Sequence, residues 1–174
     1  VYKRQLYDGL QRDGLNDSQT NEPMGMTAEN VADQYHVSRN EQDQFALQSH
    51  QRAAFATAHH YFDKEMVPIE MSQRKANSTI TVNQDESIRT DTSIEKLAKL
   101  PPVFKSGGTV TAGNSAPLND GASALLMMTE DRANELGLTP MAEVLGYTEC
   151  GIDPTVMGYA PYLAINKLVA QLKM

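Results

Sequence analysis

Apolar and helix-favouring residues in the first half of the chain predict helices separated by polar loops. One helix is expected over residues 27–36, with Thr27 as its N-cap. Ser38 and Glu41 have the spacing of a capping box, and the alanine-rich residues 42–61 favour a long helix behind it. The small and apolar side chains that share one face of this long helix are expected to pack: Phe45, Ser49, Ala53 and Ala56.

A period of two between apolar and polar residues predicts two short strands after the long helix. They are expected over residues 65–70 and 79–82, on either side of a polar loop. Thr92 and Glu95 repeat the capping-box spacing and predict a helix that ends at residue 100, because two prolines follow.

The sequence becomes apolar and low in charge after Lys105, which is typical of a protein core. Strands are expected over residues 109–111, 124–128 and 141–149. Helices are expected over residues 2–12, over residues 130–136 with Gly137 closing that helix, and after Pro161. Strands that alternate with helices predict an α/β fold class.

Composition narrows the possible partners and compartments. A net charge of −7 argues against nucleic acid, since phosphate binding needs an excess of Lys and Arg. The longest apolar run, residues 122–128, is far below the ~20 residues of a membrane span, so no membrane partner is expected. No signal-like segment follows the N-terminus, which predicts a cytoplasmic location. The start at Val1 and a C-terminus just beyond a helical pattern predict truncation at both ends.

Three features that could carry chemistry favour a structural role instead. Residues 108–115 have the spacing of a P-loop, but Asn114 stands where the phosphate-binding lysine belongs, so a tight turn is expected. Cys150 lies near two acidic residues, which disfavours a reactive thiolate. The histidines lack the spacing of metal ligands, so no metal is expected: His36, His50, His59 and His60.

Four segments resemble the motifs of thiolases in order and spacing: residues 24–32 (MGMTAENVA), 38–46 (SRNEQDQFA), 108–114 (GTVTAGN) and 118–122 (LNDGA). The resemblance implies a partial thiolase-like α/β fold, as in an internal fragment of the family. It implies three parts: a mostly helical loop region that covers CoA over residues 6–105, the end of the N-terminal domain over 106–138, and the start of the C-terminal domain over 139–174.

The resemblance also implies a function. Thiolases are acyl-CoA C-acyltransferases that condense two acetyl-CoA to acetoacetyl-CoA or cleave 3-ketoacyl-CoA with CoA, in fatty acid metabolism. They use a nucleophilic cysteine, a histidine and a second cysteine; Cys150 matches neither cysteine, so this piece alone is expected to be inactive. CoA enters as substrate and no other cofactor is implied. A homo-oligomer, dimer or tetramer, is expected for the full-length protein.

Candidate CoA contacts are carried over by position only, and no catalytic residue is among them. Phe104 resembles the phenylalanine that packs on pantetheine, and Arg89 a basic residue near the nucleotide, although a core aromatic and a solvated charge are equally ordinary roles. Ala116 stands where many members have a serine, and Ser115 is the candidate to replace it. The remaining candidates are apolar and could equally be core residues: Leu15, Met24, Leu100, Ala112, Leu118 and Met157.

Two alternatives stay open. The same motifs fit a non-catalytic thiolase-like protein that binds CoA or lipid. A helical interaction module over residues 38–61 is also possible, but it leaves residues 108–114 unexplained.

Overall fold

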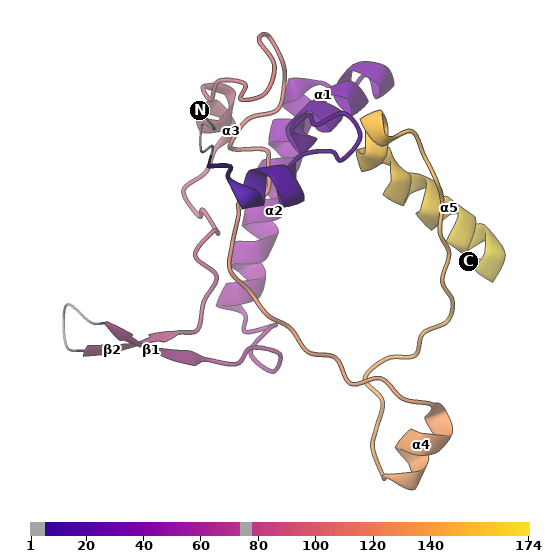
Figure 1. The fold of residues 1–174 in the computed structure, drawn as a ribbon. Coiled ribbons are helices and arrows are strands. Elements are labelled where there is room, and N and C mark those ends of the chain that lie inside the picture. The colour runs from indigo at the N-terminus through magenta and orange to yellow at the C-terminus, as the bar shows by residue number, and fades with distance from the viewer. Residues whose placement is uncertain (1–5, 74–77) are drawn as a thin grey trace, which may run out of the picture. The chain divides into compact units, whose positions relative to one another are not determined.

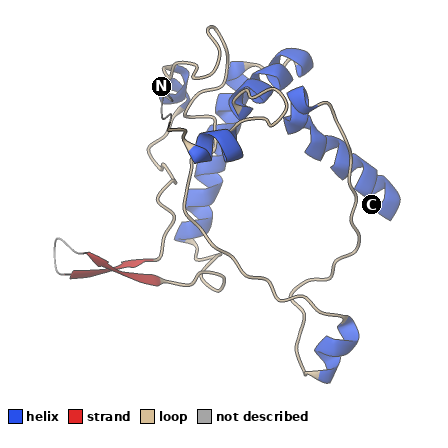
Figure 2. Ribbon diagram, viewed as in Figure 1, coloured by secondary structure: helices blue, strands red, loops and turns tan. Residues whose placement is uncertain are grey.

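The computed structural model describes residues 6–73 and 78–174. The chain divides into two compact units, one formed by Tyr35–Pro117 and the other by Val1–Gln34 together with Leu118–Met174. The strands of the described residues form a single antiparallel hairpin, and the other regular elements are helices (Figures 1 and 2). No described helix is both long and apolar enough to cross a membrane.

Helix α2 (Arg39–Ala58) begins at the predicted capping box. The Glu41 carboxylate accepts from the Ser38 backbone N–H at 2.8 Å, and the Ser38 hydroxyl accepts from the Glu41 N–H. The predicted packing face is only partly observed: Ala53 and Ala56 are half-buried, but Phe45 is 73% exposed and Ser49 is also exposed. The helix instead turns Asp43 inward, with its half-buried positions on the same face: Gln42, Ala46, His50 and Ala53.

We expect the stabilisation that the Glu41 charge gives to this capping box to be lost in acid. The Ser38 hydroxyl and then the Ser38 N–H stabilise the Glu41 carboxylate, which lowers its pKa in the folded protein. The stabilisation is complete above the ordinary pKa of a glutamate and is lost as the pH falls through the lowered folded value. Glu41→Gln keeps the cap without a titrating group. The melting temperature of the wild type minus that of the variant should therefore shrink as the pH falls, and a constant difference would contradict this account.

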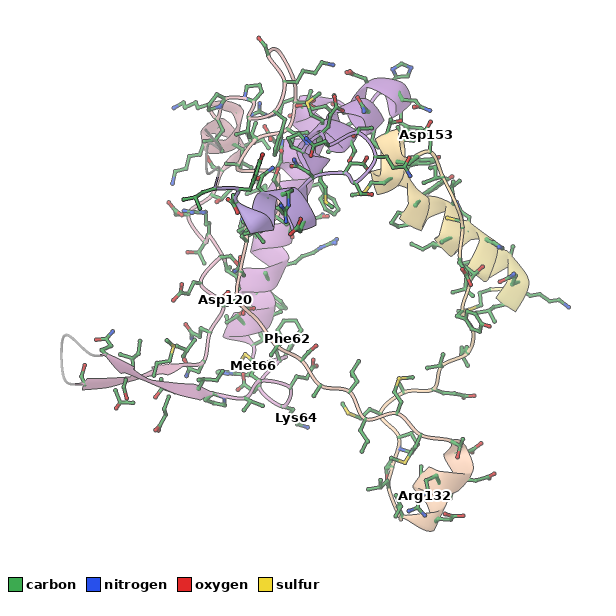
Figure 3. The ribbon with its side chains drawn as sticks, viewed as in Figure 1. Phe62, Lys64, Met66, Asp120, Arg132 and Asp153 are labelled. Atoms are coloured by element: carbon green, nitrogen blue, oxygen red, sulfur yellow. The ribbon has the colours of Figure 1, made fainter. Side chains whose placement is uncertain are left out.

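The hairpin pairs β1 (Ile69–Gln73) with β2 (Ser78–Val82), in a register that sets Ile69 opposite Val82. The second strand lies where predicted, but the first begins four residues late. Turns occupy residues 61–65, where the N–H groups of Glu65 and Met66 donate to the Phe62 carbonyl (Figure 3). The polar loop between the strands falls on residues 74–77, outside the described residues.

Helix α3 (Ile94–Ala98) is capped one residue later than predicted, since the Ser93 side chain accepts from the Lys96 N–H. The chain then doubles back: the Val103 N–H donates to the Val110 carbonyl at 3.0 Å, and Pro102 makes an isolated bridge with Thr111. That bridge is the only pairing observed for the predicted strand 109–111 among the described residues. Helix α3 packs against α2, and the core of this unit lies there: Leu97, Val110 and Thr111.

Helix α1 (Met24–Tyr35) begins three residues before the predicted cap. Thr27 is therefore inside the helix, buried, and its hydroxyl donates to the Met24 carbonyl at 2.7 Å. The predicted end is confirmed, because His36 adopts a φ of 56°. Residues 2–5 of the expected first helix lie outside the described part, and the element observed at its C-terminal end is a π-helical turn, η1 (Gln11–Leu15).

Three further elements complete the second unit. Helix α4 (Glu130–Glu135) ends before Gly137, which has a φ of 66°, as predicted. Asp153 caps the 3-10 helix η2 (Pro154–Tyr159) by accepting from the Thr155 N–H, and α5 (Ala160–Leu172) follows (Figure 3). Within this unit, α5 lies against residues 146–149, since the Lys167 ammonium donates to the Glu149 carbonyl.

The strands predicted over residues 124–128 and 141–149 are not observed as paired strands. Both segments lie outside any ladder of the described residues, and Leu125 and Met141 are 90% and 96% exposed. An extended segment becomes a strand only when a neighbour accepts and donates its backbone hydrogen bonds, and no described segment lies in register beside them.

Candidate functional site

The turn at residues 109–114 is built around the Asn114 side chain. Its Oδ1 accepts from the Thr111 N–H at 2.8 Å, and its Nδ2 donates to the Thr109 carbonyl at 3.0 Å. The Thr111 hydroxyl, fully buried, accepts from the Gly113 N–H. The side chain of Asn114 thus closes the turn on itself, so the tight turn expected from the P-loop-like spacing is confirmed.

A buried ion pair anchors this turn to α2. Asp43 accepts from Asn114 Nδ2 through Oδ1 at 3.1 Å and from Arg39 Nε through Oδ2 at 2.8 Å. The Asp43 side chain is 3% exposed and that of Arg39 24%. Arg39 Nη2 also donates to the carbonyls of Leu97 and Leu100, at the C-terminal end of α3, at 2.7 and 3.0 Å. One carboxylate therefore connects α2, α3 and the turn.

Gly113 allows the turn to approach α3 closely. A Cβ at this position would lie 2.5 Å from Leu100 Cδ1 and 2.6 Å from Leu97 Cδ2, distances that no side chain tolerates. The φ of Gly113 is not in the left-handed region, so glycine is needed here for space rather than for backbone freedom.

Five of the predicted CoA contacts gather around this turn. Ala112 is exposed at its tip, and Ser115 and Ala116 follow it, also exposed. The other two lie in the segment that follows α3 and pairs with the turn at Pro102 and Thr111: Leu100 is half-buried and Phe104 is 39% exposed. Apolar side chains and a hydroxyl are thus exposed on the turn and on the segment that pairs with it, and a ligand that is apolar along its length and polar at intervals needs these groups.

Arg89 is exposed and lies beside α2, at a point farther along that helix than Asp43. Its backbone N–H donates to His50 Nδ1 at 3.2 Å. His50 follows Asp43 by seven residues, which places it about 10 Å farther along the helix axis. One helix therefore supports both the turn and the segment that carries Arg89. The exposed guanidinium of Arg89 already has an anionic neighbour, because the pKa of Asp91 is lowered first by its hydrogen bond with Lys96 and also by the Arg89 charge.

The remaining predicted contacts belong to the other unit, where they are half-buried or exposed. Leu15 ends η1 and Met24 begins α1, with Met24 38% exposed. Leu118 is 66% exposed in an extended segment, and Met157 is 39% exposed in η2. The ten candidates are thus divided between the two units.

Sequence reasoning missed the residues that support the site. Arg39 and Asp43 have the i,i+4 spacing of an ion pair on a helix, a signal that usually marks a solvated surface. His50 was considered only as a metal ligand. Among the described residues, no group of three His, Cys, Asp or Glu side chains could hold a metal ion.

Cys150 lies in the other unit and is half-buried. Its Sγ donates to the Ala160 carbonyl at 3.2 Å. A carbonyl oxygen accepts the thiol hydrogen but cannot remove it as a base would, so this contact does not activate a nucleophile.

Comparison with known proteins agrees with the resemblance to thiolases. The family model for the thiolase N-terminal domain matches residues 1–131. A probable acetyl-CoA acyltransferase of Staphylococcus epidermidis is 49% identical over 162 residues, which are 93% of this chain and 41% of that protein. A probable acetyl-CoA acyltransferase of Staphylococcus aureus is 46% identical over 168 residues, 97% of this chain and 42% of that protein.

Solved structures show the same likeness. The crystal structure of the Bacillus anthracis acetyl-CoA acetyltransferase is 40% identical with a TM-score of 0.92, over 99% of this chain and 43% of that one. Human mitochondrial 3-ketoacyl-CoA thiolase is 41% identical with a TM-score of 0.82, over 94% of this chain and 41% of that one. The chain spans about two fifths of these proteins and has part of their α/β fold. It belongs to the thiolase family.

Proposed function

We propose that the full-length protein is an acyl-CoA C-acyltransferase that condenses two acetyl-CoA to acetoacetyl-CoA or cleaves 3-ketoacyl-CoA with CoA. The observation that carries the proposal is the 49% identity to a probable acetyl-CoA acyltransferase over 93% of this chain. The relatives' names support the acyltransferase class and the acetyl-CoA substrate. A role in fatty acid metabolism, a cytoplasmic location and a homo-oligomeric state, dimer or tetramer, belong to the proposal as well.

Within that protein, this chain contributes CoA binding. Phe104, Leu100 and Ala112 are the proposed apolar contacts near the turn, and their side chains suit the methylene and gem-dimethyl groups of pantetheine. The exposed Ser115 hydroxyl can meet a pantetheine amide, and the Arg89 guanidinium a phosphate of the nucleotide. Ala116 is a further proposed contact on the turn. Four residues of the other unit are proposed from their positions in the family alone: Leu15, Met24, Leu118 and Met157.

Residues 6–105 then form the loop region that covers CoA, with the end of the N-terminal domain over 106–138 and the start of the C-terminal domain over 139–174. The acyl-accepting cysteine and the acid-base groups lie on other parts of the polypeptide. The hydrogen bond of Cys150 to a carbonyl supports this assignment, because it offers that thiol no base.

The test compares the full-length protein with the 174-residue polypeptide in a thiolysis assay that follows loss of acetoacetyl-CoA after addition of CoA. The full-length protein should turn over, and the 174-residue polypeptide should not, because acyl transfer needs the nucleophile and the acid-base pair together. A full-length protein that binds CoA without turnover would indicate a non-catalytic thiolase-like protein. Turnover by the 174-residue polypeptide alone would refute the proposal that the catalytic groups lie on other parts of the protein.

A further inference from the structure

Two segments that carry proposed CoA contacts are fastened to the same buried carboxylate. Oδ1 of Asp43 holds the Asn114 amide, which closes the turn that bears Ala112. Oδ2 holds Arg39, whose Nη2 reaches the carbonyl of Leu100 on α3. The two oxygens of one side chain therefore set the position of the turn relative to the end of α3.

The burial of this carboxylate requires an explanation beyond stability. A buried ion pair loses solvation about as large as the attraction it gains, and apolar residues of the same volume often stabilise a protein equally well. The ion pair instead fixes the orientation of the groups that it joins, since each hydrogen bond fixes an angle as well as a distance. No buried side-chain nitrogen or oxygen of the described residues lacks a partner, so the network is complete.

We propose that Asp43 is a positioning residue for CoA: through Arg39 and Asn114 it holds the turn and the end of α3 in the arrangement that receives the pantetheine arm. The inference rests on the proposed function and adds to it a residue outside the contact surface. Without the carboxylate, the turn and α3 would be joined only by the Val103–Val110 hydrogen bond and the packing of Gly113 on α3, and ligand binding would have to restore their arrangement. CoA affinity then falls while the chemical step, carried elsewhere, is unchanged.

The test measures KM for CoA and kcat of the full-length protein in the thiolysis assay with Asp43→Asn, which keeps the volume but removes the charge that Arg39 faces. Loss of one charged hydrogen bond predicts a KM for CoA about tenfold higher, with kcat within about twofold of the wild type. The matched control is Glu135→Gln, the corresponding change in the exposed pair of Glu135 with Arg132, 2.7 Å apart. It should leave KM unchanged.

A purely structural role for Asp43 predicts another result: a lower melting temperature and less active protein, hence a lower apparent kcat, at an unchanged KM. That outcome overturns the inference. Arg39→Lys keeps the charge that faces Asp43 but loses the planar fork that reaches the Leu97 and Leu100 carbonyls, so it serves if Asp43→Asn does not fold. The same rise in KM is expected, and an unchanged KM overturns the inference. Wild-type protein without CoA turnover would overturn the proposed function and this inference with it.

Discussion

Replacing Gly113 by alanine is expected to lower the free energy of unfolding of the full-length protein by about 1–3 kcal/mol, the usual cost of an extra methyl group in a filled site. The added Cβ would lie 2.6 Å from Leu97 Cδ2, and Leu97 is only 4% exposed. Either that leucine or the turn must shift. Because the turn bears Ala112, KM for CoA should rise together with the loss of stability. Denaturant unfolding and the thiolysis assay measure the two effects.

Gly121→Ala is the matched control for this prediction. No heavy atom lies within 4 Å of a Cβ built on Gly121, and its φ is not in the left-handed region. The same methyl group should therefore change the stability by only a few tenths of a kcal/mol, as expected at sites without close neighbours. Equal effects of the two substitutions would show that the close approach of Gly113 to α3 is not what requires glycine.

Leu97→Ala is expected to cost about 2–5 kcal/mol, because a buried leucine loses its packing and leaves a cavity. Leu97 lies in the core between α3 and the turn, with Val110 6% exposed beside it in the same unit. Denaturant unfolding of the full-length protein measures the loss. A cost well below 1 kcal/mol would mean that Leu97 is not in a packed core.

The double variant of Gly113 and Leu97 tests the contact itself. Leu97→Ala removes one of the two methyl groups that the new Cβ would strike, so the alanine at position 113 gains room. The double variant should therefore lose less stability than the sum of the two single variants, as neighbouring residues commonly do. Strict additivity would contradict the geometry of the turn.

Elements determined by local chemistry could be predicted from the sequence. The capping box of Ser38 and Glu41, the end of α1 at His36 and the end of α4 at Gly137 depend on residues within four positions of each other. The second strand of the hairpin followed from its alternation. Small errors of one to four residues occurred at the starts of α1, α3 and β1, where competing polar residues offered similar caps or turns.

Features that depend on distant residues could not be predicted. Asp43 looks like a surface charge on α2, and only its contact with Asn114, 71 residues away in sequence, accounts for its burial. The apolar residues 124–128 have the composition of a core strand, but a strand also needs a paired neighbour, which the described residues do not supply.

The candidate site, too, could be predicted only in part from the sequence. The resemblance to thiolases proposed the exposed residues Phe104, Ala112 and Ser115 as CoA contacts from their positions in the family. It said nothing of what holds them in place. Hydrogen-bond distances were needed to find that Arg39 and Asp43 fasten the turn, because an ion pair at i,i+4 has the same sequence pattern whether it is buried or solvated.

A calorimetric titration of the full-length protein with CoA tests the central claim most directly, since that claim is that these residues grip a pantetheine arm. We predict saturable binding with a dissociation constant between about 1 μM and 1 mM, the range in which enzymes commonly bind their substrates. A folded protein that releases no heat of binding with CoA or acetyl-CoA, and shows no shift in melting temperature with either, would contradict the account.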